Sequence, residues 1–429
     1  MHIGVIGAGY VGLVTGVSLA CNGHSVTLVE RSADRVEALR AGRVPISEPG
    51  LSEAFESARE RIAVVEAIEE MKGTELAFLC VGTPTKEDGE PDLHELVEAA
   101  NALGERPDLH LSVRSTVPPG TSVRLPATFG RADGAHLSTN PEFLRQGTAM
   151  QDFIHPSRIV IGVYPDTTAD HIERVQAAFA GVEAPRLTVS VAAAELIKNV
   201  ANGFLALKLS FVNEVAGLAE EYGVDVDDIL TGIALDPRIG SAYMRPGMGF
   251  GGSCLPKELQ VLASAGRRQG LSMHVARAAA QVNAEQQDRF IRRVLKELPH
   301  HARVGLLGLS FKAFTDDLRG SPAVYAAKRL LEAGHSVVAY DPAADPGRAV
   351  DAIPGVEVCQ SAIDVFREAD AVIVGTEWPM FAETDFRAAR QLVKNPLIFD
   401  GRNLLNPDNV TAAGFEYRGV GRVSSDRRS

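Results

Sequence analysis

The segment from His2 to Glu30 constrains the fold of this chain more than any other part of the sequence. A short β-branched run, HIGVI, leads into the glycine-rich turn GAGYVG. A helical pattern follows, and SVTLVE forms a second strand pattern that ends at Glu30. This order of strand, glycine turn, helix and strand begins a doubly wound α/β fold, in which helices cover both faces of a parallel sheet. We therefore predict a Rossmann-like sheet in this part of the chain.

The three glycines of the turn predict a dinucleotide site. Gly7, Gly9 and Gly12 match G-x-G-x-x-G. The first glycine makes the tight turn, the second lets the backbone approach a pyrophosphate, and the third lets the helix pack on the strand. The helix begins beside Tyr10 and Val11, where free N–H groups favour a negatively charged phosphate. A tight turn without a ligand is the alternative interpretation.

The acidic residue at the end of the second strand indicates which dinucleotide binds. Glu30 lies 18 residues past Gly12. A carboxylate at this distance binds the ribose 2′-OH and repels a 2′-phosphate, so the predicted cofactor is NAD. The neighbouring Arg31 leaves NADP as an alternative.

Composition narrows the class of protein further. The chain has 429 residues, of which 45% are hydrophobic and 23% charged, so we expect two or three domains. A net charge of -12 argues against nucleic acid as the main partner. The four cysteines have no metal-ligand spacing and read as reduced thiols, and we expect no metal site. We find no signal-peptide pattern and no membrane-length apolar run, which predicts a cytoplasmic protein without a membrane partner.

The C-terminal third repeats the pattern of the first. RVGLLGLSFK at 303–312 echoes HIGVIGAGYV, and GHSVVAYD at 334–341 echoes GHSVTLVE. We therefore predict a second doubly wound α/β domain. Its first turn lacks the second and third glycines and carries Lys312, which suggests a second phosphorylated ligand held by charge. A degenerate repeat kept as a scaffold is the alternative.

A long helix is predicted between the two repeats. Apolar residues recur at spacings of four and three from Leu196 to Tyr222, and the opposite face also carries apolar residues. We expect the helix to be buried on both sides, to join the domains and to pack against a second subunit. Lys198 and Asn202 share one face of it, and a lone lysine among apolar residues is costly unless it has a function. The predicted domains are 1–191 for NAD binding, 192–299 for the helical connector, and 300–429 for the second α/β domain.

Taken together, the motifs resemble the UDP-glucose/GDP-mannose dehydrogenase family over nearly the whole chain, from Met1 to about Gly419. The resemblance implies NAD-dependent oxidation of a nucleotide sugar at C6 to a carboxylate, with two NAD per turnover, by a homodimer. UDP-glucose is the default substrate. The matching stretches are GAGYVG, VGTP, STVPPGT, NPEFLRQGTAMQDF, ELIKNVANGF, DPRIG, GFGGSCLPK, GLSFKAFTDDLR and DGRN.

The stretch FGGSCLPKE places Cys254 where this chemistry needs a nucleophile. Oxidation of an alcohol to an acid removes two hydrides, and a thiolate holds the intermediate aldehyde as a thiohemiacetal and then as a thioester that water cleaves. We expect a flexible, glycine-flanked loop that lets Cys254 reach the sugar. A cation such as Lys198 or Lys257 would raise the thiolate fraction. A structural cysteine is the alternative.

The resemblance also implies roles for other residues. Lys198 and Asn202 would stabilise the oxyanion at C6. Glu142 would be the base for hydrolysis, Thr116 would position a water or touch the nicotinamide, and Glu258 would help to move protons. Further cofactor contacts are expected at Thr83, Gln146, Lys257 and Arg319. Substrate contacts are expected at Glu142, Phe143, Leu144, Arg145, Phe250, Gly251, Lys312 and Arg402, and at Arg238 from the neighbouring subunit.

Three positions depart from the family pattern, and three alternatives remain. Glu258 stands where the family has aspartate, Gln146 where it has glutamate, and Gly320 where it often has glutamate. The first alternative is another sugar nucleotide, such as TDP-glucose, GDP-mannose or a UDP-N-acetylhexosamine. The second is a two-electron β-hydroxyacid dehydrogenase, which has no use for Cys254. The third is a nucleotide-sugar sensor that has lost turnover.

Overall fold

The chain divides into two compact units in a computed structural model that describes residues 1–84, 92–103, 106 and 108–423. Unit 1 comprises Met1–Ala201 and Ser264–Leu271, and unit 2 comprises Asn202–Ala263 and the described part of Ser272–Ser429. The boundary between the units therefore falls within two helices. The division into three domains stays a prediction.

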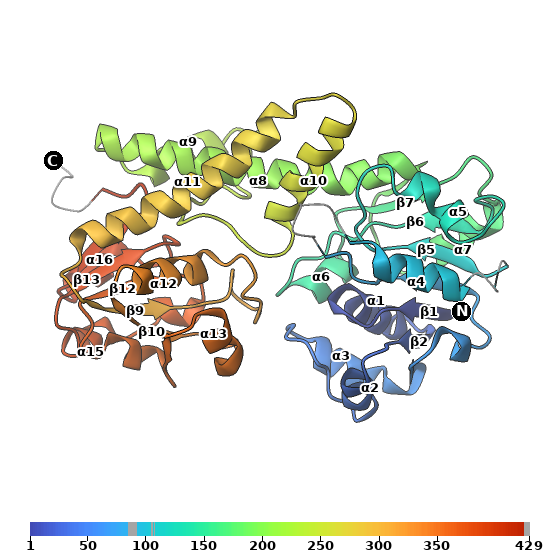
Figure 1. The fold of residues 1–429 in the computed structure, drawn as a ribbon, viewed down its shortest axis with the longest axis horizontal. Helices are drawn as coiled ribbons and strands as arrows, with labels where there is room; N and C mark the ends of the chain where they lie inside the picture. The colour runs from blue at the N-terminus through green and yellow to red at the C-terminus, as the bar shows by residue number, and fades with distance from the viewer. Residues whose placement is uncertain (85–91, 104–105, 107, 424–429) are drawn as a thin grey trace. The chain divides into compact units, whose positions relative to one another are not determined.

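Unit 1 is built on a sheet whose order, within the described residues, is β3-β2-β1-β4-β5-β6-β7-β8 (Figure 1). Neighbouring strands are parallel except β6 and β7, which are antiparallel. The strands are β1 His2–Ile6, β2 Ser25–Val29, β3 Ile62–Val65, β4 Leu76–Leu79, β5 His110–Val113, β6 Leu137–Thr139, β7 Ile159–Val163 and β8 Arg186–Ser190.

Unit 2 repeats the first six positions of that order as β11-β10-β9-β12-β13-β14, and all of these strands are parallel. Both orders correspond to the doubly wound sequence 3-2-1-4-5-6. The prediction of two Rossmann-like sheets is therefore confirmed. The strands are β9 Arg303–Leu307, β10 Ser336–Tyr340, β11 Glu357–Val358, β12 Ala371–Val374, β13 Leu397–Asp400 and β14 Glu416–Gly419.

Helices cover both faces of each sheet because the central strands are apolar on both sides. In β1, Val5 belongs to the core under α1, α3, α6 and α7, while the next residue, Ile6, belongs to the core under α4 and α5. The helices are α1 Tyr10–Cys21, α2 Ala33–Arg40, α3 Leu51–Ser57, α4 His94–Leu103, α5 Leu125–Thr128, α6 Ala149–Ile154, α7 Ala169–Ala178, α8 Val191–Tyr222, α9 Val226–Ala234, α10 Leu255–Arg268, α11 His274–Glu297, α12 Pro322–Glu332, α13 Pro346–Ala352, α14 Pro379–Ala382, α15 Phe386–Arg390 and α16 Pro407–Ala412.

The long helix predicted from the apolar pattern is α8, but only one of its faces is buried within this chain. In unit 2, the small residues Ala206, Ala216 and Ala219 are at most 1% exposed. The large apolar residues on the other face are exposed, at 59% for Phe204 and 54% for Phe211. The exposed face is the one that the expected second subunit would cover, so burial of α8 on both sides stays a prediction.

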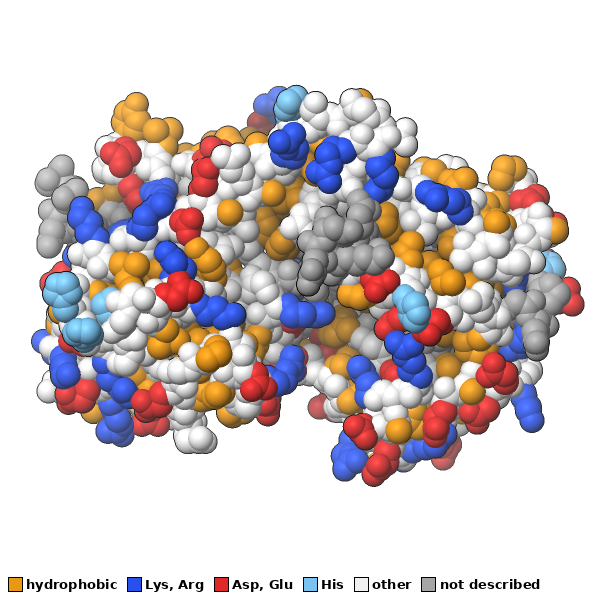
Figure 2. All heavy atoms as spheres, viewed as in Figure 1, with side chains coloured by type: hydrophobic (Ala, Val, Ile, Leu, Met, Phe, Trp, Pro, Cys, Tyr) orange, Lys and Arg blue, Asp and Glu red, His pale blue; other side chains and the backbone are white. Residues whose placement is uncertain are grey.

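The surface shows mixed charge. Acidic and basic side chains are interspersed on the face of each unit that Figure 2 shows. Within the residues that the structure describes, no helix has both the length and the apolar character needed to cross a membrane.

Candidate active site

The glycine turn of unit 1 has the shape that a bound pyrophosphate requires. Gly7 has φ +92°, and a Cβ on Gly12 would lie 1.8 Å from the carbonyl oxygen of Gly7. These two positions therefore accept only glycine. A Cβ on Gly9 would meet no atom within 4 Å, so the turn is open on that side, at the N-terminus of α1. The residues present thus fit NAD, whose pyrophosphate would rest on Gly9, Tyr10 and Val11.

The acidic residue after β2 is buried and held in place. A carboxylate oxygen of Glu30 accepts a hydrogen bond from the Ser32 N–H at 3.0 Å, and Arg35 Nε lies 3.6 Å from the other oxygen. The neighbouring Arg31 was the reason for keeping NADP as an alternative cofactor. It pairs with Glu95 and Glu98 at 2.8 Å each. The basic side chain next to Glu30 is therefore engaged with α4, which favours NAD.

The corresponding turn of unit 2 has the same backbone shape, but its N–H groups bind a side chain of the same unit. Gly308 has φ +92°, as Gly7 does. However, the Asp341 carboxylate accepts hydrogen bonds from the N–H groups of Leu309 and Ser310 at 2.7 and 2.8 Å. Its own acidic residue thus occupies two amides of this turn, and no dinucleotide pyrophosphate is expected to bind them.

Lys198 and Glu142 form a buried ion pair at the carboxyl edge of the unit 1 sheet. Lys198 Nζ lies 2.9 Å from Glu142 Oε1, and the two side chains are only 5% and 8% exposed. The other Glu142 oxygen accepts a hydrogen bond from the Leu144 N–H at 2.6 Å. The ammonium group is of the kind that stabilises an oxyanion, and the adjacent carboxylate is of the kind that acts as a base and activates water.

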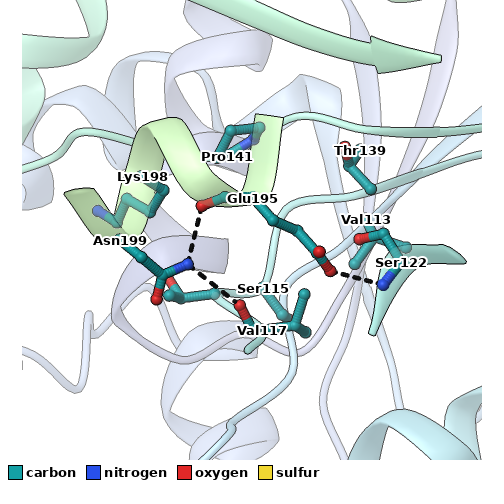
Figure 3. A pocket seen from close by; sticks show the side chains of 10 residues that line it. Val113, Ser115, Val117, Ser122, Thr139, Pro141, Glu195, Lys198 and Asn199 are labelled. Carbon is teal, nitrogen blue, oxygen red and sulfur yellow. Dashed lines mark hydrogen bonds between the residues drawn. The ribbon is translucent and has the colours of Figure 1, made fainter. Parts of the chain in front are cut away.

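A small cavity adjoins this pair (Figure 3). Its volume of about 10 Å³ is room for about one water molecule. Asn199 follows Lys198 on α8 and donates hydrogen bonds to the carbonyl oxygens of Glu195 and Val117. Among the described residues, neither Asn199 Oδ1 nor Thr139 Oγ1 has a partner, and both residues line the cavity. Sequence reasoning had not selected Asn199.

Glu48 is a second residue that sequence reasoning missed. It is 7% exposed, and its carboxylate accepts hydrogen bonds from the N–H groups of Gly147 and Ala149, each at 2.6 Å. The Tyr10 hydroxyl also donates to it. Burial, with the neighbouring Glu48, raises the pKa of Tyr10. Glu48 thus joins the glycine turn to the start of α6.

The predicted substrate segment after β6 uses several of its own groups internally. The Leu144 N–H bonds Glu142, and the Arg145 N–H donates to Asp152 at 2.9 Å. These two amides are therefore occupied within the segment and do not contribute to the substrate contacts expected at residues 142–145. The Phe143 ring lies under the Arg158 guanidinium, at 3.7 Å, and 5.4 Å from Lys198 Nζ. Gln146 follows in the same segment.

Cys254 lies in unit 2, immediately before α10. It is exposed, and its carbonyl oxygen accepts a hydrogen bond from the Glu258 N–H at 2.9 Å, the first bond of the helix. The positive end of a helix dipole favours an anion at this position, as a reactive thiolate requires. Lys257 and the buried Glu258 lie in the first turn of α10.

Buried carboxamides hold the backbone at the start of this loop, and the flexibility expected near Cys254 stays a prediction. Asn283 Oδ1 accepts from the Phe250 N–H at 2.8 Å, and Asn283 Nδ2 donates to the Phe250 carbonyl at 3.0 Å. At Gly247, the carbonyl oxygen accepts a hydrogen bond from Gln286 and the N–H donates one to Asn213. The glycines are needed for close packing, since a Cβ on Gly251 would lie 1.9 Å from the Gly320 carbonyl oxygen. The sequence pattern gave no sign of these carboxamides.

Three basic residues of unit 2 have different surroundings. Arg319 pairs with Asp317. The hydrogen bond to Asp317 raises the pKa of Arg319, and the nearby Cys254 contributes a smaller effect in the same direction. Arg402 donates to the carbonyl oxygens of Gly249, Phe311 and Gly375, so its guanidinium braces the cysteine loop. Lys312 Nζ lies 5.8 Å from the Phe311 ring centroid.

The remaining predicted residues are Thr116, which lines the small cavity together with Lys198, and Thr83, Asn202 and Arg238. Thr83 donates its hydroxyl to the Thr116 carbonyl at 2.6 Å, which joins two loops at the edge of the unit 1 sheet. Asn202 lies one turn beyond Lys198 on α8. The Arg238 side chain is 87% exposed and pairs with Asp236. Among the residues that the structure describes, no group of three or more His, Cys, Asp or Glu side chains is arranged to hold a metal ion.

The glycine turn, the acid after β2 and the buried lysine define an NAD-dependent oxidoreductase. Three models of the UDP-glucose/GDP-mannose dehydrogenase family match the chain: the NAD binding domain at residues 1–180, the central domain at 192–285 and the UDP binding domain at 305–407. The chain belongs to this family of nucleotide-sugar dehydrogenases.

Individual relatives agree with the family. A UDP-glucose 6-dehydrogenase of Rickettsia bellii (strain RML369-C) is 37% identical over 432 residues, which cover 98% of this chain and 99% of the relative. A UDP-glucose dehydrogenase structure from Pyrobaculum islandicum has 37% identity and a TM-score of 0.88, and covers 98% of each chain. The structure of a UDP-D-ManNAc dehydrogenase from Pyrococcus horikoshii has 25% identity and a TM-score of 0.85, and covers 98% of this chain and 99% of its own.

The two hydrogen bonds between the Asn283 carboxamide and the Phe250 backbone predict that a variant without them loses activity in a pH-dependent way. In the variant Asn283→Asp, the introduced carboxylate still accepts from the Phe250 N–H but repels the Phe250 carbonyl. We expect NADH formation at pH 8 to fall about ten-fold, which corresponds to the loss of one buried hydrogen bond. The ratio of variant to unaltered activity should rise as the pH falls, because the protonated acid regains a donor. Absorbance at 340 nm measures both.

Asn409→Asp makes the same chemical change at an exposed position of α16 and is the matched control. Its activity should follow that of the unaltered protein at every pH. Equal pH profiles for Asn283→Asp and the unaltered protein would contradict the role assigned to this carboxamide.

Proposed function

We propose that the protein oxidises UDP-glucose at C6 to UDP-glucuronate. The reaction consumes the alcohol, two NAD⁺ and water, and yields the carboxylate, two NADH and three protons. The observation that carries this proposal is the buried Lys198–Glu142 pair in the NAD-binding unit, taken together with Cys254 at the N-terminus of α10. The relatives named UDP-glucose 6-dehydrogenase support the choice of sugar.

In this proposal, the side chains divide the work as follows. Bound NAD supplies the hydride acceptor. The Lys198 ammonium stabilises negative charge on the C6 oxygen, with help from Asn202. Loss of a hydride from C6 and of the hydroxyl proton to solvent first converts the alcohol to an aldehyde. The Cys254 thiolate then adds to the aldehyde carbon, which forms a C–S bond and places the carbonyl electron pair on oxygen. Departure of the second hydride from C6 leaves a thioester.

Hydrolysis of the thioester completes the proposed reaction. Glu142 takes a proton from water, the resulting hydroxide attacks the C6 carbonyl, and the C–S bond breaks to release the thiolate. The ion pair with Lys198 holds the Glu142 carboxylate in place beside the ammonium group. We expect Thr116 to position water and Glu258 to help move protons. Glu258 and Gln146 depart from the family pattern, and we expect the enzyme to be active with both.

We further propose that a nucleotide sugar binds unit 2, with Lys312 at a phosphate and Phe250, Gly251 and Arg402 near the sugar. The match to a UDP binding domain at residues 305–407 supports a uridine nucleotide. The occupied amides around Asp341 agree with a ligand other than a dinucleotide. The relative that is named for UDP-D-ManNAc keeps an N-acetylated hexosamine as the alternative sugar.

We also propose a homodimer formed through the exposed apolar face of α8. Phe204, Phe211, Leu218 and Tyr222 are each more than half exposed in the single chain, which a stable soluble helix does not leave uncovered. Arg238, which is exposed and pairs with Asp236 in its own turn, would then reach the substrate of the neighbouring subunit.

The stoichiometry of NADH tests the proposed reaction. With UDP-glucose limiting and NAD in excess, we expect two NADH per sugar, because the aldehyde stays bound until the second oxidation. Cys254→Ala should form no UDP-glucuronate, since no thioester can form.

A panel of UDP-, TDP- and GDP-sugars identifies the substrate when NADH formation is followed by absorbance at 340 nm. One NADH per sugar with released aldehyde would contradict the four-electron reaction, and ligand binding without NADH would favour a sensor.

Light scattering after size-exclusion chromatography tests the dimer. The unaltered protein should have twice the mass of one chain. Phe211→Asp places a charge in the face that the dimer would bury and should weaken association by at least about 100-fold. Val350→Asp changes an exposed apolar residue of α13 and should leave the mass unchanged. A monomeric unaltered protein would refute this part of the proposal.

A further inference from the structure

Glu195 lies on α8 one turn before Lys198, and no step proposed above uses it. It is 4% exposed. Its carboxylate accepts hydrogen bonds from the N–H groups of Gly120, at 2.8 Å, and Ser122, at 2.5 Å. Figure 3 shows the carboxylate pointing toward Ser122, and both Glu195 and Lys198 line the small cavity.

The two amides belong to the loop that begins with Thr116, in the stretch STVPPGTS. Gly120 has φ +93°, so the loop turns sharply where Glu195 holds it. Asn199, one turn farther along α8 than Glu195, donates to the Val117 carbonyl at 3.4 Å. α8 thus contacts this loop through the backbone of Val117, Gly120 and Ser122.

The opposite side of the turn is held as well. The Tyr164 hydroxyl donates to the Ser122 carbonyl at 2.5 Å, so both backbone groups of Ser122 are engaged by buried side chains. Burial raises the pKa of Glu195, and the hydrogen bonds from Ser122 and Gly120 act against this. Hydrogen bonds to a carboxylate are stronger than those between neutral groups, and burial excludes water from competing for them.

From this geometry we infer that Glu195 is a positioning residue, which fixes Thr116 relative to Lys198 by binding the Thr116–Ser122 loop to α8. The inference rests on the proposed function, in which both residues act on the same reaction. The arrangement is local to unit 1. One helix carries the lysine and, a turn earlier, the carboxylate that anchors the loop.

Glutamine is the sharpest substitution at this position. Glu195→Gln keeps the size of the side chain, but its carbonyl oxygen accepts only one of the two hydrogen bonds, and its NH2 group faces the second N–H as another donor. Glu195→Asp keeps both acceptor oxygens and loses one methylene of reach. Glu183→Gln, at an exposed site of unit 1, is the matched control.

Hydrogen exchange followed by mass spectrometry, together with steady-state kinetics on the full-length protein, tests the inference. In Glu195→Gln, a peptide covering 117–124 should exchange at least about ten-fold faster while peptides from β1 and β4 stay protected, because only the local anchor is lost. kcat should fall at least about ten-fold, as expected when a reacting group shifts by a fraction of an ångström. KM for the nucleotide sugar should change less than about two-fold, and Glu195→Asp should give intermediate values.

The outcomes separate this inference from the proposed function. Unchanged exchange of the 117–124 peptide would overturn the anchoring role. Faster exchange with unchanged kcat would show that the anchor is structural only, which also overturns the inference. If the unaltered protein reduces no NAD with any nucleotide sugar, the proposed function fails and the positioning role with it, while the exchange data still decide whether the anchor exists. If Glu195→Gln does not fold, Glu195→Asp provides both measurements.

Discussion

The buried ion pair between Lys198 and Glu142 is the interaction on which the account of unit 1 depends. Moving either charge out of water is costly, and removal of one partner leaves an uncompensated buried charge at a cost of about 3–5 kcal/mol. The pair therefore fixes α8 against the segment after β6, at 2.9 Å. It also holds an ammonium group and a carboxylate next to each other, and the proposed reaction uses one to stabilise an oxyanion and the other to activate water. In that proposal, stability and chemistry depend on the same ion pair.

The two Rossmann-like sheets show how one backbone shape supports two kinds of site. Gly7 and Gly308 have the same φ of +92°. In unit 1 the acid after the second strand bonds its own loop, and the glycine turn stays open at Gly9. In unit 2 the corresponding acid, Asp341, binds the turn itself. The two turns therefore differ both in their second and third glycines, which unit 2 lacks, and in whether the acid after the second strand binds the turn.

Much of this fold was predictable from the sequence, because strand patterns, glycine turns and an acid at a fixed spacing are local signals. Both sheets, the glycine turn of unit 1 and the long helix α8 were predicted on this basis. The supporting residues were not. Asn283 and Gln286 hold a loop more than 30 positions away, and Glu48 holds a segment about 100 positions away. A buried amide or carboxylate that bonds distant backbone leaves no periodic trace in the sequence. The glycines of the cysteine loop predicted flexibility, and the structure shows that Gly251 also permits close packing against the Gly320 backbone.

The central claim is that the Cys254 sulfur becomes bonded to the oxidised sugar carbon, and mass spectrometry of a hydrolysis-impaired variant tests it most directly. Glu142→Gln removes the base, while its amide oxygen still accepts a hydrogen bond from Lys198. After incubation with UDP-glucose and NAD, the account predicts that the peptide containing Cys254 carries the mass of a UDP-glucuronyl acyl group, and that the same peptide from a Glu142→Gln, Cys254→Ala double variant does not. NADH formation by Glu142→Gln with an unmodified Cys254 peptide would contradict the account.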